Sequence, residues 1–306
     1  MKENKATDSP CNLCPRRCGA LRAAGVRGFC GAGKLAKVAL VSLHPWEEPC
    51  LAGEKGAGTV FFSHCELRCV FCQNHAISTE GFGIEVSASR LAEIFLEQQA
   101  KGAATLDLVS PTHYAMPIRE ALLLAKQQGL QIPVVYNSSG YESVETIDAM
   151  RGLIDVFLPD FKYFDETTAL RYSFAPHYFT YASQVMLKMR ELVPQDVFDT
   201  TGRMQKGLLI RLLVLPNHRR DSMAILDWLA KHLGTTTRVS IMRQYTPLYQ
   251  AASFPEINRP LTTFEYESVV RHALALGFTN AYVQEGAAVS ESFVPAFDGR
   301  GVMNRK

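Results

Sequence analysis

Short β-rich runs alternate with helical patterns from residue 58 onward, and this alternation limits the possible folds more than any other feature. Apolar residues at helical spacing predict helices between the predicted strands. Strand–helix units that repeat in this way form a parallel sheet, either open and doubly wound or closed into a barrel. The predicted strands are Thr59–Ser63, Thr105–Val109, Pro133–Tyr136, Val156–Pro159, Leu208–Leu215, Val239–Met242 and Thr279–Val283. The predicted helices are Ala88–Lys101, Ile118–Gln128, Val144–Arg151, Ala169–Leu192, Ser222–His232 and Phe264–Leu276.

Three cysteines, Cys65, Cys69 and Cys72, follow the first predicted strand in the pattern C-x3-C-x2-C. Three thiolates so close together can bind three corners of an iron–sulfur cube, which has four irons. The fourth iron would be free to hold a substrate or cofactor, as the open position of a catalytic zinc does. The same spacing also suits half of a zinc site, so the cysteines alone leave both metals open.

With Phe71 immediately before the last cysteine, the motif resembles the signature of the radical S-adenosylmethionine superfamily. The resemblance implies that Cys65, Cys69 and Cys72 bind a [4Fe-4S] cluster whose open iron chelates S-adenosylmethionine. Reductive cleavage of S-adenosylmethionine would then give a 5′-deoxyadenosyl radical that abstracts hydrogen from a substrate. The resemblance also selects the fold, a partial (β/α)6 TIM-like barrel of the α/β class. Over residues 58–290 the chain is most similar to the branch related to pyruvate formate-lyase activating enzymes.

Polar groups follow six consecutive predicted strands, where barrels of this kind build their active sites. This agreement favours an enzyme more strongly than the cysteine motif alone. The six exits are His64-Cys65-Glu66-Leu67-Arg68-Cys69, Ser110-Pro111-Thr112-His113-Tyr114, Asn137-Ser138-Ser139-Gly140, Asp160-Phe161-Lys162, Pro216-Asn217-His218 and Arg243-Gln244-Tyr245.

The resemblance implies cofactor contacts at three of these exits. Ser110 and Thr112 stand where activating enzymes carry a Gly-Gly-Glu that binds the methionyl amino group. Asn137 begins a turn similar to their Asp-Thr-Asn-Gly, and Lys162 matches a lysine that reaches the cofactor carboxylate. Each assignment has a structural alternative. Thr112 could cap the next helix, and Asn137 could belong to an internally capped turn. Lys162 could be a surface residue paired with Asp160 or Asp165.

Other residues at the exits carry weaker predictions. His113 and His218 are possible ligand contacts, although a loop histidine more often has a structural role. Gly140 suits a turn that needs a positive φ angle. Arg211 lies within an apolar strand, where an unpaired charge is costly, so it should form a salt bridge or contact the cofactor.

The N-terminal segment carries four further cysteines, Cys11, Cys14, Cys18 and Cys30, spaced C-x2-C-x3-C-x11-C. This spacing, with glycines and a proline that allow tight turns, suits a second metal site. Zinc and a second, fully ligated iron–sulfur cluster fit it equally. We therefore expect a cysteine-rich metal-binding extension over residues 1–50 and a catalytic domain over residues 51–306. Cys50 has no partner in either group, and we expect it to be a buried structural thiol.

Composition excludes several classes of function. The 32 basic and 30 acidic residues are interspersed and give a net charge of +2, which does not favour nucleic acid as a partner. The longest apolar stretch, Leu208–Leu215, contains Arg211 and is too short to span a membrane. The segment Met1–Thr7 has no apolar core of a signal peptide, and all eight cysteines lie in the first 72 residues. We expect a cytoplasmic protein with metal-binding cysteines.

The sequence therefore predicts a radical S-adenosylmethionine oxidoreductase that takes electrons from a flavodoxin or ferredoxin. Its substrate is an unknown protein or small molecule, and the sequence assigns no catalytic residue. Activation of a glycyl-radical enzyme is the family analogy. However, residues 53–59 replace the Asp-Gly-Pro-Gly-Arg stretch of activating enzymes.

Two alternatives come from other classes of protein. A non-catalytic iron–sulfur electron carrier would recruit a fourth ligand, with Cys50 and His64 nearest in sequence. A zinc-stabilised interaction protein would use both cysteine groups for structure.

Overall fold

The computed structural model describes residues 10–284 and 295–303, and the segment Met1–Thr7 lies outside them. The described strands form one mixed sheet in the order β10-β9-β8-β6-β5-β4-β2-β1-β3, with β7 paired to β8. Neighbouring strands from β2 to β10 along this order run parallel. The seven parallel strands confirm the seven predicted ones. They are β2 (Ala57–Phe62), β4 (Leu106–Val109), β5 (Val134–Ser138), β6 (Val156–Pro159), β8 (Met204–Leu213), β9 (Arg238–Met242) and β10 (Ala281–Val283).

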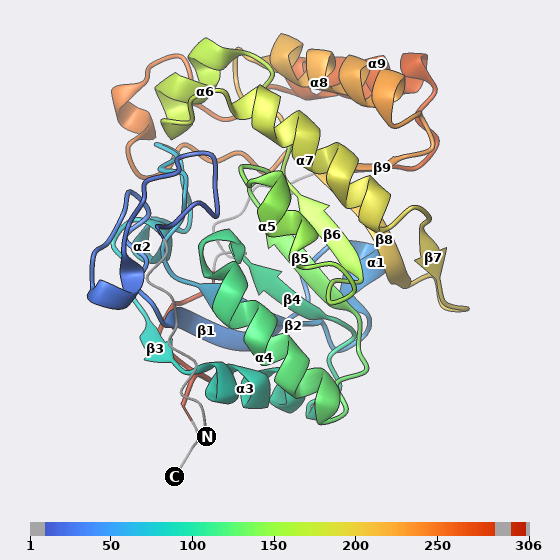
Figure 1. The fold of residues 1–306 in the computed structure, drawn as a ribbon. Helices are drawn as coiled ribbons and strands as arrows, with labels where there is room; N and C mark the ends of the chain where they lie inside the picture. Colours follow the sequence, from blue (N-terminus) through green and yellow to red (C-terminus); the bar gives the residue numbers. More distant parts are fainter. Residues whose placement is uncertain (1–9, 285–294, 304–306) are drawn as a thin grey trace.

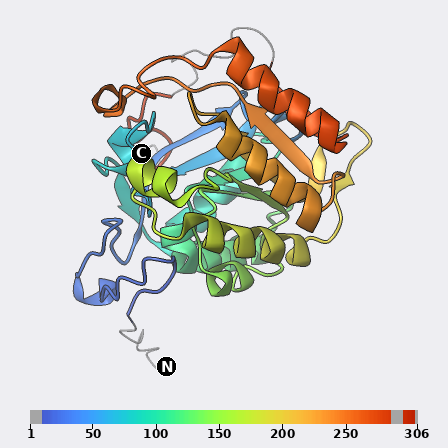
Figure 2. The same ribbon diagram turned by 90° about the horizontal axis from the view of Figure 1, so that it is seen from above.

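Helices cover the outer face of this sheet (Figure 1), and the view from above shows them as an arc around the strands (Figure 2). Side-chain caps fix where several of them begin, as Ser87 does by accepting a hydrogen bond from the Arg90 N–H. The helices are α3 (Ala88–Ala100), α4 (Ala115–Gln127), α5 (Val144–Asp148), α6 (Glu166–Ser173), α7 (Tyr178–Leu192), α8 (Arg219–His232) and α9 (Thr263–Leu276).

One predicted helix was wrong, because residues 169–192 do not form a continuous helix. The chain ends α6 at Ser173 and starts α7 at Tyr178. Phe174 and His177, which bound the break, both have positive φ angles. Pro176 lies between them, and its ring excludes the helical conformation for the residue before it.

Several short elements were not predicted. They are β1 (Ala36–His44), β3 (Ile84–Val86), β7 (Val197–Phe198), α1 (Pro49–Ala52) and α2 (His75–Ser78). β1 pairs antiparallel with both β2 and β3. The sheet therefore begins inside residues 1–50, which we expected to form an extension, although a domain boundary at residue 50 stays a prediction.

The sheet is curved and has a filled interior. Arg211 on β8 lies 3.7 Å from Glu47, which follows β1, although four strands separate β8 from β1 in the sheet order. Side chains alternate between the two faces, as the period of a strand requires. Tyr136 packs in the cluster that includes the helices, whereas Val135 packs in a separate interior cluster with Leu51 of α1. α1 therefore closes one end of the interior, and the sheet itself is an unclosed, partial barrel.

Within the described residues, no helix is both long and apolar enough to cross a membrane. This agrees with the absence of a long apolar stretch in the sequence.

Candidate active site

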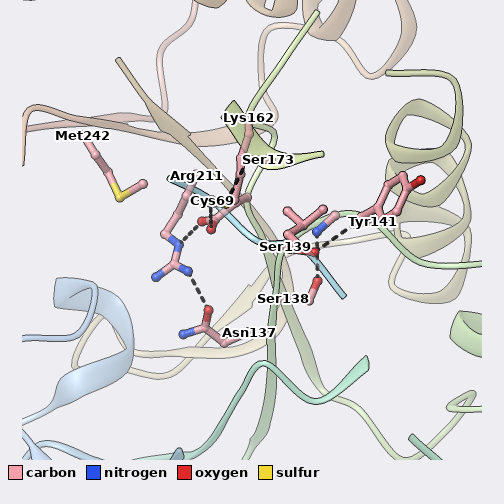
Figure 3. Close-up of polar contacts among 12 residues, drawn as sticks. Cys69, Asn137, Ser138, Ser139, Tyr141, Lys162, Ser173, Arg211 and Met242 are labelled. Carbon is pink, nitrogen blue, oxygen red and sulfur yellow. Dashed lines mark hydrogen bonds and ion pairs between the residues drawn. The ribbon is translucent and has the colours of Figure 1, made fainter. Parts of the chain in front are cut away.

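The three cysteines of the motif lie in the loop between β2 and α2, and each sulfur has a polar neighbour within hydrogen-bond distance. The Ser173 hydroxyl donates to Cys69 Sγ at 2.9 Å, and the Leu67 N–H donates to Cys65 Sγ at 3.4 Å. Cys69 and Ser173 are labelled in Figure 3. Cys72 Sγ lies 3.3 Å from the Ser78 hydroxyl. Hydrogen bonds to cysteine sulfur are a feature of iron–sulfur sites, where they tune the cluster.

Burial makes these three thiols poor acids in the absence of a metal. It raises the pKa of Cys69 to about 11, with the Lys162 ammonium acting in the opposite direction. Burial also raises the pKa of Cys72, and burial with the Glu66 carboxylate raises that of Cys65. The positively charged iron atoms of a cluster would reverse this effect, because coordination deprotonates a thiol.

Among the described residues, no three His, Cys, Asp or Glu side chains stand close enough to share one metal ion. A cluster does not require this, because each of its cysteines binds a different iron. The donors present, three thiols in one loop, fit a [4Fe-4S] cluster chemically. A single zinc ion does not fit Cys11, Cys14, Cys18 and Cys30 as they stand, since zinc requires all its ligands around one point.

The two residues that could have completed a four-ligand cluster lie elsewhere. The His64 ring packs against Gly31 and Gly81, where an added Cβ would come within 3.0 Å and 2.5 Å of it. Cys50 is buried in the interior cluster with Leu51, as expected for a structural thiol.

Ser110 and Thr112 follow β4 and have different surroundings. Ser110 adopts a positive φ of 57°, and its N–H donates to the Asn137 carbonyl at 2.9 Å. Thr112 is fully buried, and its hydroxyl donates to Glu142 at 2.9 Å. Thr112 does not cap α4, which begins without a side-chain cap, and its hydroxyl holds Glu142 instead.

Asp160 joins Lys162 to Arg211, and Arg211 also contacts Asn137. These side chains lie at the exits of β5, β6 and β8. Asp160 accepts from Lys162 Nζ at 2.6 Å and from Arg211 Nε at 2.9 Å. Figure 3 shows the guanidinium of Arg211 directed at the Asn137 amide oxygen, 2.5 Å away. Arg211 therefore forms the salt bridge predicted for it, and it also faces the interior. The Asp160 carboxylate neutralises both cations, and all three charged side chains are partly exposed, at 16%.

Two carboxyl groups lie deeper in the same interior. The Asn137 amide donates to Asp107 and to Glu47, both at 3.4 Å. Burial and the Glu47 carboxylate raise the pKa of Asp107 well above its ordinary value. The shift favours the protonated form of the Asp107 carboxyl group. The sequence analysis missed both residues, although a carboxylate within the apolar run Leu106–Val109 was a detectable signal.

His113 and Glu66 form a buried polar pair behind the cysteine loop. His113 Nδ1 lies 3.4 Å from the Glu66 carboxylate, and His113 Nε2 lies 2.8 Å from the Ser63 carbonyl. The Ser139 hydroxyl also donates to Glu66. His113 thus has partners on both ring nitrogens and links the exits of β2 and β4. His218 Nε2 lies 2.9 Å from the Tyr172 hydroxyl.

Gly140 has the positive φ that we predicted, at 76°. A Cβ atom there would approach the Asp160 carbonyl to 2.4 Å. The turn after β5 can therefore pack closely against the exit of β6 only with glycine at this position.

Comparison with known proteins places the chain in a family. An uncharacterised protein of Methanocaldococcus jannaschii, MJ0674, is 32% identical over 273 residues, which cover 86% of this chain and 74% of the relative. A family model of the radical SAM superfamily matches residues 59–204, which include the three motif cysteines and Lys162. The chain belongs to the radical SAM superfamily. Radical SAM proteins are enzymes that use S-adenosylmethionine and a [4Fe-4S] cluster.

Solved structures of radical SAM proteins share the fold. SuiB of Streptococcus suis, bound to the precursor peptide SuiA, aligns with a TM-score of 0.51 and 12% identity over 72% of this chain and 46% of SuiB. HydG of Carboxydothermus hydrogenoformans, an FeFe-hydrogenase maturase, aligns with a TM-score of 0.50 and 11% identity over 72% of this chain and 50% of HydG. The chain thus matches half or less of these two proteins, and at such low identity the likeness concerns the fold alone.

Proposed function

We propose that this protein reductively cleaves S-adenosylmethionine at a [4Fe-4S] cluster and uses the 5′-deoxyadenosyl radical to abstract hydrogen from a substrate. The observation that carries the proposal is the position of Cys65, Cys69 and Cys72. They follow β2, the first parallel strand. Lys162 follows β6, and its positive charge acts on Cys69. A cluster held there would lie next to a cation suited to a carboxylate ligand.

The polar residues of the strand exits would bind and orient the cofactor. Lys162 would bind the cofactor carboxylate, and Asn137 and Ser110 would hydrogen-bond its polar groups. Asp160 keeps Arg211 as a partner at 2.9 Å, so it would stay neutralised when Lys162 turns toward a ligand. Thr112 would contribute through Glu142, which it holds by a hydrogen bond.

The reductant and the substrate are defined only by class. We infer that a flavodoxin or ferredoxin supplies the electron, because cleavage consumes one from the cluster. The substrate is a protein or a small molecule. A peptide substrate has a precedent in the peptide-bound SuiB, whereas activation of a glycyl-radical enzyme rests on the similarity to the activating-enzyme branch alone.

The N-terminal cysteines remain a proposed second metal site. Cys30 is buried and Cys18 is exposed, so the four side chains would have to move to close around one ion. Zinc and a second iron–sulfur cluster both remain open. All eight cysteines are free thiols, which suits a protein of the reducing cytoplasm.

Electron paramagnetic resonance tests whether S-adenosylmethionine binds at the cluster. We expect the signal of the reduced wild-type cluster to change when S-adenosylmethionine is added. Lys162→Ala should weaken this binding roughly ten- to hundredfold, the worth of a charge-assisted hydrogen bond. Lys188→Ala is the matched control, because Lys188 pairs with Glu191 on the surface of α7. If the signal of the reduced cluster does not change when S-adenosylmethionine is added, the result would support an electron carrier instead.

A further inference from the structure

The N-terminal cysteine-rich segment is packed against the loop that carries the motif cysteines. Figure 1 shows it in dark blue beside α2, and Figure 2 shows the same segment at the edge of the molecule. Its contacts reach several strand exits. The Leu13 carbonyl, for example, accepts from the Ser143 N–H at 3.3 Å and from the Thr146 hydroxyl at 2.8 Å. The segment therefore forms part of the wall around the candidate active site.

Arg16 makes the contacts that join this segment to the cysteine loop. Its Nε donates to the Glu66 carbonyl at 2.6 Å, directly after Cys65 in the chain. Its Nη2 donates to the Phe174 carbonyl at 2.6 Å, in the break between α6 and α7. The guanidinium thus bridges two backbone segments that both adjoin motif cysteines, since Glu66 follows Cys65 and Ser173, beside Phe174, donates to Cys69.

An aromatic platform fixes the orientation of this guanidinium. Arg16 stacks over the Phe29 ring, with its central carbon 3.4 Å from the ring centroid. Arg68, which lies between Cys65 and Cys69, stacks on the same ring at 4.4 Å and donates to the Phe29 carbonyl. Stacking of this kind is a property of arginine that lysine does not reproduce.

The positive charge of Arg16 lies at the backbone of the loop that carries the motif cysteines. Residues 10–46 contain no Asp or Glu, so the segment brings positive charge to the loop. Three thiolates give a cluster an excess of negative charge, and reduction adds one electron. A permanent cation at the backbone of the ligand loop stabilises the more negative, reduced state.

We propose that Arg16 is a positioning residue for the [4Fe-4S] cluster, which holds the Cys65–Cys69 loop and raises the reduction potential of the cluster. This inference rests on the proposed function only for the presence of the cluster. It gives the cysteine-rich segment a role in the electron-transfer step.

Two substitutions separate the charge of Arg16 from its hydrogen bonds. Arg16→Gln keeps a donor but removes the charge, and Arg16→Lys keeps the charge but removes the planar fork. Arg17→Gln is the control, because Arg17 is exposed and no side-chain hydrogen bond or ion pair joins it to the other described residues. The readout is the midpoint potential of the reconstituted cluster, titrated with dithionite and followed by electron paramagnetic resonance, together with iron content.

We expect Arg16→Gln to shift the midpoint potential to more negative values, and Arg17→Gln to leave it at the wild-type value. Arg16→Lys should stay nearer to wild type in potential but lose iron faster on dilution. An unchanged potential in Arg16→Gln with full iron content would overturn the inference. If Arg16→Gln holds no cluster, the midpoint potential of Arg16→Lys tests the inference, and a value near that of the wild type is expected. A midpoint potential in Arg17→Gln as negative as that in Arg16→Gln would refute a specific role for Arg16. A wild type that assembles no cluster would refute the proposed function itself.

Discussion

Glu142 is a buried carboxyl group with only one of its oxygens bonded. Oε1 accepts from the Thr112 hydroxyl, whereas Oε2 has no hydrogen-bond partner in the part of the chain that the structure describes. Burial, followed by the nearby Glu66 carboxylate, raises the pKa of Glu142 to about 8. The folded protein therefore keeps this side chain protonated at a pH where the unfolded chain would lose the proton.

This difference predicts that Glu142 lowers stability as the pH rises. Because the pKa is raised in the folded state, the penalty is absent below the ordinary carboxyl pKa and grows until the folded pKa of about 8. We expect Glu142→Gln to gain melting temperature relative to wild type as the pH rises from about 5 to about 8. Thermal unfolding of both proteins across this range checks it. A difference in melting temperature that is independent of pH would contradict the raised pKa.

At this scale the sequence predicted residues whose role follows from type and spacing. The positive φ of Gly140, the salt bridge of Arg211 and the burial of Cys50 are confirmed. Buried partners such as Glu66 and Glu142 were not predicted. Their environment depends on tertiary contacts, including the hydrogen bond from Ser139, that no local pattern encodes.

α9 begins with a capping arrangement that also connects it to the exit of β8. The Thr262 hydroxyl accepts from the Glu265 N–H, and the Glu265 carboxylate accepts in return from the Thr262 N–H. The same carboxylate accepts from the Asn217 N–H at 2.6 Å and pairs with Arg259 at 2.7 Å. The Arg259 hydrogen bond, against the effect of burial, lowers the pKa of Glu265 below its ordinary value.

Glu265→Gln should therefore destabilise the protein by about 1 kcal/mol at neutral pH, because it keeps the capping oxygen but removes the charge that pairs with Arg259. Since the folded pKa is lowered, the contribution is complete above the ordinary carboxyl pKa and disappears as the pH falls through the folded value. Denaturant unfolding at pH 7 and near pH 3 measures the difference. A gap between wild type and variant that widens toward acid would show that the carboxylate is not the stabilising form.

Elements with a clear hydrophobic period were predicted well, and those defined by single residues or by pairing were not. β5 and β6 are short apolar runs with buried residues throughout, and they lie where we predicted them. The break between α6 and α7 depends on Pro176. It was not predicted, because the apolar residues on both sides of Pro176 keep a continuous helical spacing. β1 could not be identified as a strand from its own sequence, because its pairing with β2 and β3 defines it.

The whole molecule is a curved parallel sheet whose interior changes from apolar to polar along the strands. Leu51 of α1 and the neighbouring valines close one end. Asp160, Lys162 and Arg211 line the other end, beside the loop of the motif cysteines. This arrangement follows from the alternation of inward and outward residues, and it would let the barrel exclude water around a radical intermediate. The contribution of the N-terminal segment to the wall was not predictable, because it depends on the Arg16 bridge.

The most direct test of the account is the formation of 5′-deoxyadenosine. The protein is reconstituted anaerobically with iron and sulfide, then incubated with dithionite and S-adenosylmethionine, and the products are separated by chromatography. We expect 5′-deoxyadenosine from the wild type and none from Cys65→Ala, Cys69→Ala or Cys72→Ala, whereas Cys50→Ala should retain it. A wild type with a spectroscopically intact [4Fe-4S] cluster that yields no 5′-deoxyadenosine would contradict the proposed radical chemistry.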